Sequence, residues 1–249
     1  MQDKKVWILD IETSPCIVMV WELGKQYVGI DQLIEDWHIM SFSAKRLNAS
    51  PNSLIYMETR TKDDKKLLKK LWEIFNDADV VITQNGKGFD EPKIKARMML
   101  QGFKPYKPFA HHDTYLQNKD KAFTSHSLAH LSQKFCKKYK KLKHKKFTGL
   151  SLWKECLGAE IVLHPNPKAW DEMKKYNKHD VLSDEELYIN TQGWSKANAP
   201  TIYEGDIDRK CSYCGEFSLV VDGYKTKRAA KYKYMHCKEC GKYQMGSKV

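Results

Sequence analysis

Apolar and polar residues follow two different periods along this chain, and the change of period separates predicted strands from predicted helices. In the first sixty residues, short apolar runs are bounded by polar residues and turn formers. These runs predict four strands, at Lys5–Thr13, Cys16–Leu23, His38–Leu47 and Ser53–Thr59. Strands this close in sequence are most easily joined as antiparallel hairpins.

The period becomes helical from about residue 63, where apolar side chains share one face and lysines occupy the other. Further predicted strands, at Ala78–Asn85 and Phe109–Thr114, alternate with predicted helices near Pro92–Gly102, Ser127–Tyr139 and Lys168–Thr191. Hairpin-like strands followed by alternating helices and strands predict an α/β fold, with a mixed β-sheet flanked by helices. We therefore expect a core at 1–195, a linker at 196–208 and a small module at 209–249.

Two acidic residues, Asp10 and Glu12, lie two positions apart in the first predicted strand. Side chains at this spacing point to the same face, about 6–7 Å apart along the strand. Two carboxylates so placed repel one another unless a cation lies between them, and a divalent metal ion is the usual solution. For this motif alone, solvated acids at the end of a strand explain the pattern as well as a metal site does.

Two further segments carry acids in suitable settings. Asp90 lies between a glycine turn, Gly86 to Gly88, and a predicted helix, where an Asp alone often caps the helix. Tyr176 and Asp180 are four residues apart on the long C-terminal helix and therefore share a face, as surface residues of an amphipathic helix also do. Each segment alone has these ordinary explanations.

Taken together, the three segments resemble the DEDD 3′–5′ exonucleases of the ribonuclease H-like superfamily. The matching motifs are Asp10-Ile11-Glu12, then Asn85 through Phe89-Asp90, then Tyr176 to Asp180, and they cover roughly residues 1–195. One subfamily carries a His five residues before its last Asp, a position that is Lys175 here. The tyrosine type therefore fits, and His179 is a minor alternative to Tyr176.

The resemblance implies a ribonuclease H-like fold and a two-metal active site. Asp10, Glu12, Asp90 and Asp180 would hold two Mg²⁺ or Mn²⁺ ions about 3.5–4 Å apart. Tyr176 would orient the attacking water, because a pKa near 10 makes a full general base unsuitable.

The resemblance also assigns Thr13, Asn85 and Phe89 to the substrate, although core packing is an equal alternative for Phe89. Two spare acids stay off the primary set. We expect Asp113 to cap a turn and Asp184, one helical turn beyond Asp180, to support the site from behind.

Four of the seven cysteines form two C-x-x-C pairs near the C-terminus: Cys211, Cys214, Cys237 and Cys240. This spacing predicts one structural Zn²⁺ held by four thiolates, and it resembles a zinc ribbon. His236 is adjacent, but the four thiolates already complete the shell. Paired cysteines of this kind favour a metal site in a reducing, cytoplasmic compartment over a disulfide framework.

The net charge of +12 is concentrated in two places. Residues 121–150 hold nine Lys and no acid, and residues 209–249 hold ten Lys or Arg against three acids. These excesses of +9 and +7 leave −4 for the remainder, a distribution that suggests a polyanionic partner. Lys137–Lys146 would flank the active site or form a flexible solvated loop. Tyr224–Tyr234 would bind a single strand, or it would be the solvated surface of a module that serves only as a folding staple.

The sequence as a whole predicts a two-metal 3′–5′ exonuclease that acts on a nucleic acid with a single-stranded 3′ end and that uses the zinc ribbon to hold it. A structure-selective endonuclease on the same fold and a non-catalytic nucleic-acid binding module are the alternatives. The choice between DNA and RNA, and the oligomeric state, stay open. No apolar run approaches 18 residues, so we expect no membrane span and no signal peptide.

Overall fold

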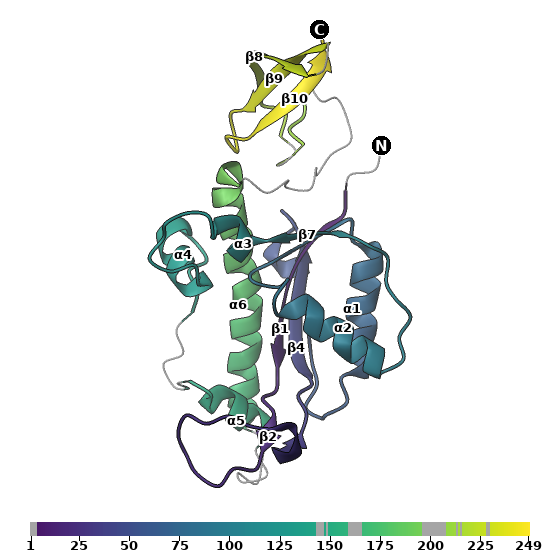
Figure 1. Ribbon diagram of the computed structural model, residues 1–249, viewed down its shortest axis with the longest axis vertical. Coiled ribbons are helices and arrows are strands. Elements are labelled where there is room, and N and C mark those ends of the chain that lie inside the picture. The colour runs from purple at the N-terminus through teal and green to yellow at the C-terminus, as the bar shows by residue number, and fades with distance from the viewer. Residues whose placement is uncertain are drawn as a thin grey trace.

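The structure is a computed structural model with an elongated shape, in which a mixed α/β body carries a small β-module at one end (Figure 1). It describes residues 4–142, 147, 149–158, 166–195, 208–212, 214, 216–227 and 230–249. The predicted linker lies outside the described residues except for Asp208, and so does the 143–146 part of the basic segment.

A five-stranded sheet forms the body, in the spatial order β5-β4-β1-β6-β7. Its strands are β1 (Val6–Thr13), β4 (Ile39–Arg46), β5 (Ile55–Glu58), β6 (Val80–Thr83) and β7 (Ala110–Asp113). β4 runs antiparallel to both of its neighbours, β1 and β5, whereas β6 and β7 run parallel to β1. The mixed sheet predicted from the sequence is confirmed, including the β4–β5 hairpin.

Helices cover both faces of this sheet (Figure 1). On one face, α1 (Lys65–Asp77) and α2 (Asp90–Leu100) bury a core that includes Leu9, Phe42 and Leu71. On the other face lies the 25-residue helix α6 (Pro167–Thr191), whose Val181 packs against Ile8 of β1. Because side chains alternate along a strand, odd residues of β1 face α1 and even residues face α6. This places Asp10 and Glu12 under α6.

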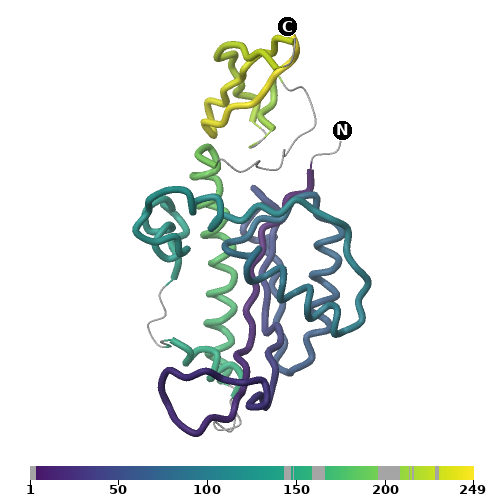
Figure 2. The backbone as a smooth tube through the Cα atoms, in the orientation of Figure 1, coloured from purple at the N-terminus to yellow at the C-terminus, as the bar shows by residue number. Residues whose placement is uncertain are grey.

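The strand predicted at Cys16–Leu23 is wrong beyond its first residues. Only Ile17–Val18 (β2) pair, with β3 (Leu33–Glu35), which was not predicted. The apolar residues that follow are exposed, with Trp21 and Leu23 at 99% and 97%. An apolar run forms a strand only where a neighbouring strand and a core receive it. This run instead forms a loop at the end of the molecule far from the β-module (Figure 2).

Short helices are the other elements that the sequence did not predict: α3 (Thr114–Asn118), α5 (Ser151–Leu157) and three 3₁₀ turns at Ile30–Gln32, Pro51–Ser53 and Gln192–Trp194. None is long enough to show a full hydrophobic period. The helix predicted at Ser127–Tyr139 is present as α4 (Leu128–Phe135) and ends at Cys136, whose backbone is extended.

The C-terminal module is a three-stranded antiparallel sheet made of β8 (Leu219–Lys227), β9 (Ala230–Cys237) and β10 (Tyr243–Lys248). It lies against the C-terminal end of α6, where Lys242 Nζ donates a hydrogen bond to the carbonyl oxygen of Ser195. A Cβ atom at Gly193 would lie 2.0 Å from the carbonyl oxygen of Cys240, so only glycine permits this approach. Among the described helices, none is long and apolar enough to span a membrane.

Candidate active site

The site forms where β1 extends beyond its parallel neighbour. β1 pairs with β4 as far as Thr13 but with β6 only as far as Ile8. The C-terminal half of β1 therefore has one edge that no strand covers. Asp10 and Glu12 lie on this half, both half-buried beneath α6. This matches the position that their spacing predicts.

The side chain of Asp90 forms a hydrogen bond with the uncovered edge of β1. Its Oδ1 accepts a hydrogen bond from the backbone N–H of Ile11 at 3.0 Å, in place of the ladder bond that β6 no longer supplies. The preceding turn reaches this position because Gly86 approaches Thr83 closely, where an added Cβ would lie 2.1 Å from Thr83 Oγ1. Asn85 adopts a left-handed conformation in the same turn, with φ of 64°. The predicted glycine turn thus positions Asp90 next to β1.

Helix α6 supplies Asp180, and this completes a close group. Oxygen atoms of Asp10, Glu12 and Asp180 all lie within 4.8 Å of one another. Asp90 is buried beside them but lies outside this close group, and its Oδ1 accepts the hydrogen bond from Ile11. Of the four carboxylates predicted as metal ligands, the structure brings three together and places the fourth at their edge.

A neighbour of Tyr176 on α6, which sequence reasoning did not select, holds Asp10 in place. The side-chain amide of Asn177 donates to Asp10 Oδ2 at 2.6 Å and to the carbonyl oxygen of Asp10 at 3.2 Å. Asn177 is fully buried, three residues before Asp180 and thus on the same helical face. The three-residue spacing between Asn177 and Asp180 was the only feature of the sequence that could have indicated this role.

Lys141 is the second residue that sequence reasoning missed. Its Nζ lies 2.6 Å from Asp180 Oδ2 and 4.7 Å from the centre of the Tyr176 ring. The segment before it is tied to α6, because the backbone N–H groups of Lys137 and Tyr139 donate to Glu186. The described part of the basic segment therefore reaches the carboxylate group through Lys141.

The pKa values of the carboxylates are raised, as expected for buried acids that lie close together without a cation. Burial and the neighbouring Glu12 and Asp90 raise the pKa of Asp10 well above its usual range. Burial, assisted by Asp180, raises the pKa of Glu12 to about 8, and burial raises that of Asp90 to about 7. Burial also raises the pKa of Asp180, although Lys141 opposes the shift. Added positive charge would relieve this crowding of acids.

The donor set fits a hard divalent cation. All three clustered side chains offer carboxylate oxygens, the ligands that Mg²⁺ and Mn²⁺ prefer. Among the described residues, Oδ1 of Asp180 is buried and has no hydrogen-bond partner. A buried oxygen of this kind is costly unless something coordinates it. Asp10, Glu12 and Asp180 are therefore the residues that would hold metal, with Asp90 beside them.

Tyr176 lies at the edge of the carboxylate group, packed edge-to-face against Trp153 with ring centres 6.4 Å apart. Burial and nearby Asp180 raise the pKa of its hydroxyl above the ordinary value. The hydroxyl therefore stays protonated at neutral pH. His179 faces away, and its Nε2 lies 2.7 Å from the carbonyl oxygen of Lys140. The structure thus favours Tyr176 over His179 at this position.

A cavity of about 250 Å³ begins at Thr13, the residue after Glu12, and is lined by Thr13, Ser14, Pro15, Cys16, Trp37, Lys93, Leu150 and Trp153. Its lining contains Thr13, which directly follows Glu12, and Lys93, one turn after Asp90 on α2. Lys93 Nζ lies 3.7 Å from the centre of the Trp37 ring and 5.1 Å from that of Phe89. Phe89 is 39% exposed and is not one of the buried core residues. Asn85 is also exposed and lies on the turn leading to Asp90.

The two spare acids have structural partners. Asp113 caps α3, accepting from the backbone N–H groups of Tyr115 and Leu116, and it also accepts from the N–H of Asn85 at 3.0 Å. Asp184 Oδ1 accepts from the hydroxyl of Thr114 at 2.6 Å, and burial raises the pKa of Asp184 to about 7. Neither belongs to the close carboxylate group. The expected cap at Asp113 is present.

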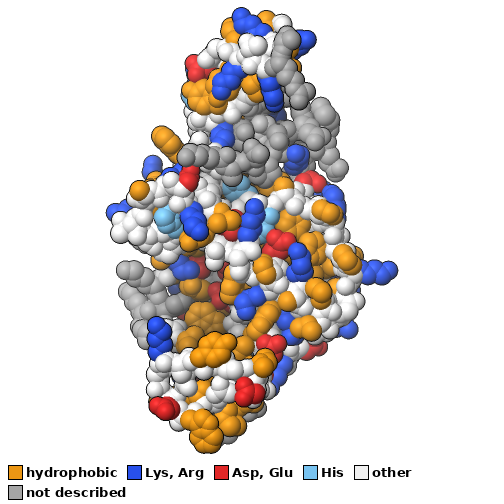
Figure 3. Space-filling model, in the orientation of Figure 1, with side chains coloured by type: hydrophobic (Ala, Val, Ile, Leu, Met, Phe, Trp, Pro, Cys, Tyr) orange, Lys and Arg blue, Asp and Glu red, His pale blue; other side chains and the backbone are white. Residues whose placement is uncertain are grey.

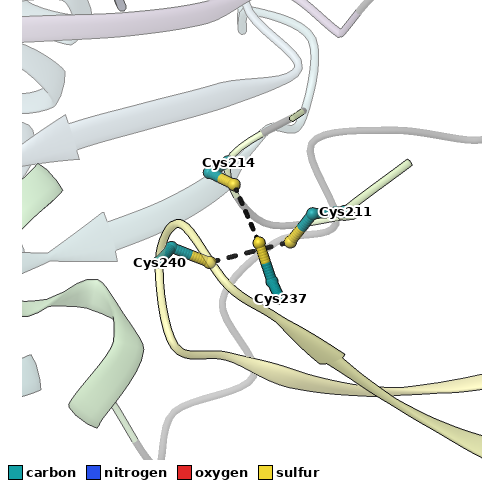
Figure 4. A group of neighbouring side chains, drawn as sticks. All are labelled: Cys211, Cys214, Cys237 and Cys240. Atoms are coloured by element: carbon teal, nitrogen blue, oxygen red, sulfur yellow. Dashed lines mark hydrogen bonds between the residues drawn. The ribbon is translucent and has the colours of Figure 1, made fainter. Parts of the chain in front are cut away.

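The four predicted zinc cysteines converge at the base of the C-terminal module (Figure 4). The Sγ atoms of Cys211 and Cys240 are 3.7 Å apart, and those of Cys214 and Cys237 are 3.6 Å apart. A tetrahedral zinc site with Zn–S bonds of about 2.3 Å has sulfur–sulfur edges of about 3.8 Å. Both distances are close to this value, so the cluster fits one structural Zn²⁺.

Comparisons with known proteins bear on the fold and the family. A family model described as the RNase_H superfamily matches residues 36–192, more than half of the chain. Among solved structures, the chain is similar to a family B DNA polymerase from the hyperthermophilic archaeon Pyrobaculum calidifontis, with a TM-score of 0.54 and 15% sequence identity. The likeness covers 78% of this chain and 25% of the polymerase chain, and at this identity it concerns the fold. No curated protein matches the chain.

Proposed function

This chain belongs to the RNase H superfamily, and from this premise we propose that it is a metal-dependent nuclease that removes nucleotides from the 3′ end of a nucleic acid. The superfamily suggests nuclease activity in general, whereas the direction and the end preference rest on the sequence motifs. The observation that carries the proposal is the convergence of Asp10, Glu12 and Asp180 within 4.8 Å, on elements far apart in sequence. Such a group of acids destabilises the protein unless it serves a cation.

Two Mg²⁺ or Mn²⁺ ions, when bound, would supply the positive charge that activates a water molecule and stabilises the departing oxygen. The chain's own residues prepare that chemistry. Asn177 fixes the rotamer of Asp10 by a hydrogen bond of 2.6 Å. The protonated hydroxyl of Tyr176 can orient water beside the phosphate without accepting its proton. Lys141, next to Asp180, adds a positive charge that favours an anionic substrate.

The cavity next to Glu12 supports a nucleotide as the ligand. It combines two aromatic side chains, Trp37 and Trp153, with the ammonium of Lys93. Aromatic faces stack with bases, and an ammonium contacts phosphate. We therefore assign the terminal nucleotide to this cavity. Thr13, Asn85 and Phe89 would contact the substrate there. An unpaired 3′ end fits this assignment, because a base must leave its stack to enter.

We propose two units in the chain, a nuclease domain at 1–195 and a zinc ribbon at 209–249. The ribbon's ten Lys or Arg residues against three acids support a role in holding the nucleic acid. Four thiolates kept free for zinc fit a reducing compartment.

The test uses 5′-labelled DNA and RNA oligonucleotides, each with a free 3′ end or with an inverted 3′-terminal nucleotide. With Mg²⁺ or Mn²⁺, we expect stepwise shortening of the free-ended substrate, protection of the blocked one, and no reaction in EDTA. Internal cleavage of the blocked substrate would instead indicate an endonuclease. Binding without cleavage under any metal would indicate a non-catalytic binding module.

A further inference from the structure

The zinc ribbon carries a stack of aromatic rings on one face of its sheet. Tyr243 lies between His236 and Tyr234, with ring centres 4.5 Å and 5.1 Å away and planes within 17° and 20° of its own. We call these three residues the aromatic ladder. The Nζ of Lys225 lies 3.7 Å from the centre of the Tyr234 ring, at one end of the ladder.

The strand register separates this face from the opposite one. Tyr243 pairs with His236, and Tyr234 lies two residues from His236 on β9, so all three share a face. The opposite face holds buried Met235 and Cys237, and Cys237 is one of the four clustered cysteines. On the ladder face, no side chain of the described strand residues is buried. The ladder therefore lies on the open face of the sheet, where Lys225 contacts Tyr234 and Asp222 contacts Tyr243.

The charge of the ribbon as a whole indicates the chemistry of the ladder's partner. Residues 209–249 carry a net charge of +7, and Figure 3 shows Lys and Arg side chains beside hydrophobic ones on the ribbon surface. A peptide or lipid partner that matched the rings alone would leave these cations unpaired. Unpaired bases joined by phosphates satisfy both features, because every base has a face for stacking and every phosphate a negative charge.

We propose that the aromatic ladder is a binding site for single-stranded nucleic acid, which takes up the strand whose 3′ end lies in the active site. The proposal rests on the nuclease function proposed above. The rings already touch one another, so a base would stack at an end of the ladder rather than between its members. At the Tyr234 end, the base would displace the ammonium of Lys225, which is then placed to contact the adjoining phosphate.

The position of the ladder suits a strand that extends from the active site. Asp180 and the end of α6 at Thr191 are eleven residues apart, about 17 Å along a helix. The ribbon lies beyond that end of α6 (Figure 1). Only substrates longer than this separation can contact the active site and the ladder together.

The experiment measures the binding of a fluorescent oligothymidylate, its oligouridylate counterpart and a DNA duplex to the full chain. All proteins carry Asp10→Asn to prevent cleavage. We expect Tyr234→Leu to weaken single-strand binding by about tenfold, the effect of losing one stacked base. Tyr243→Leu should also weaken it, because it removes the ring against which Tyr234 and His236 stack. Duplex binding should hardly change, because paired bases hide their faces and only phosphates are contacted. Tyr243→Phe retains the ring and should retain affinity.

Tyr224→Leu is the matched control. Tyr224 is 54% exposed on the same sheet, but it pairs with Lys233 and so lies on the opposite face, beneath Lys231. The proposal is overturned if Tyr234→Leu leaves single-strand affinity unchanged, if Tyr224→Leu weakens it as much as Tyr234→Leu does, or if Tyr243→Phe weakens it as much as Tyr243→Leu.

A second measurement needs no substitution in the ribbon. In protein with isotopically labelled tyrosine, oligothymidylate should shift the ring signals of Tyr234 and Tyr243 and leave those of Tyr224 in place. Equal shifts at all three would contradict the proposal. Single-strand binding by the ladder in a chain that never cleaves would overturn the nuclease proposal alone. If the chain cleaves but the ladder variants bind single strands as the wild type does, only the ladder proposal is overturned.

Discussion

The Nζ of Lys141 lies 2.6 Å from Oδ2 of Asp180, in the midst of the carboxylates that would hold metal. The two side chains are 22% and 4% exposed, so the pair is largely removed from water. Burial lowers the pKa of Lys141, but Asp180 and Tyr176 more than reverse the effect and leave the pKa above its usual value. Lys141 is therefore a fixed positive charge that partly balances the acids of the active site.

Replacing Lys141 with Met should destabilise the metal-free protein. The carboxylates would lose their internal cation, at a cost of about 2 kcal/mol in the free energy of unfolding. Urea unfolding in EDTA measures this, and added Mg²⁺ should restore more stability to the variant than to the wild type. Lys140→Met, at an exposed neighbour, is the control and should behave like wild type. Equal stability of Lys141→Met and wild type in EDTA would contradict this role.

Tyr176→Phe removes a hydroxyl but no metal ligand. Because burial keeps that hydroxyl protonated, we expect it to orient water, and its loss should lower kcat by about 100-fold. Binding of Mn²⁺, followed by titration calorimetry, should not change. His179→Ala should remain active, since His179 contacts the Lys140 carbonyl and not the carboxylates. A fully active Tyr176→Phe together with an inactive His179→Ala would show that the third motif was misinterpreted.

The strands and helices that position the carboxylates were predictable because they have a clear hydrophobic period. The β1 prediction placed Asp10 and Glu12 on one face, and the long helix placed Asp180 opposite them. The same reasoning failed at Cys16–Leu23, where apolar residues form an exposed loop. An apolar run gives no information about whether a neighbouring strand exists to pair with it.

Lys141 and Asn177 could not be selected from the sequence. Lys141 is one of nine lysines within thirty residues, and only the folded chain brings it to Asp180. Asn177 was visible as a helical neighbour of Asp180, but its contact with Asp10 joins residues 167 positions apart. The cavity that holds Trp37, Lys93 and Trp153 likewise draws on three distant segments. Such sites depend on tertiary contacts, which local patterns do not encode.

The pair of Glu91 and His111 predicts a pH dependence of stability. His111 Nδ1 lies 2.7 Å from Glu91 Oε2, and this hydrogen bond lowers the pKa of Glu91 to about 2. A carboxyl group with a depressed pKa in the folded state stabilises the protein fully above its unfolded pKa, near 4.3. This contribution is lost as the pH falls from there toward 2.

Glu91→Gln should therefore lower the free energy of unfolding by about 1–2 kcal/mol at pH 7. The difference from wild type should shrink as the pH falls below about 4. Urea unfolding at a series of pH values provides the measurement. Glu73→Gln is the control, because Glu73 is 45% exposed and its pair with Lys70 contributes little. A difference for Glu91→Gln that is the same at low and neutral pH would argue against the depressed pKa.

Loss of zinc should unfold the ribbon alone. Structural zinc contributes about 10–16 kcal/mol of apparent binding energy, more than so small a module can supply by burial. Cys237→Ser should therefore abolish zinc content and the ribbon's unfolding transition, while the nuclease domain still unfolds cooperatively. Cys16→Ser, at an exposed cysteine outside the cluster, should leave both unchanged. Collapse of the nuclease domain in Cys237→Ser would show that the two units do not fold independently.

Two identical substitutions on one helix test whether the carboxylates of β1 and α6 form the catalytic centre. Asp180→Asn removes an oxygen from the close group, whereas Asp171→Asn changes an exposed residue of α6. The measurement is the rate of release of labelled nucleotide from a 3′-labelled oligonucleotide in Mn²⁺, with folding checked by circular dichroism. We predict that Asp171→Asn cleaves like wild type and that folded Asp180→Asn shows no hydrolysis. Equal turnover by the two variants would contradict the account.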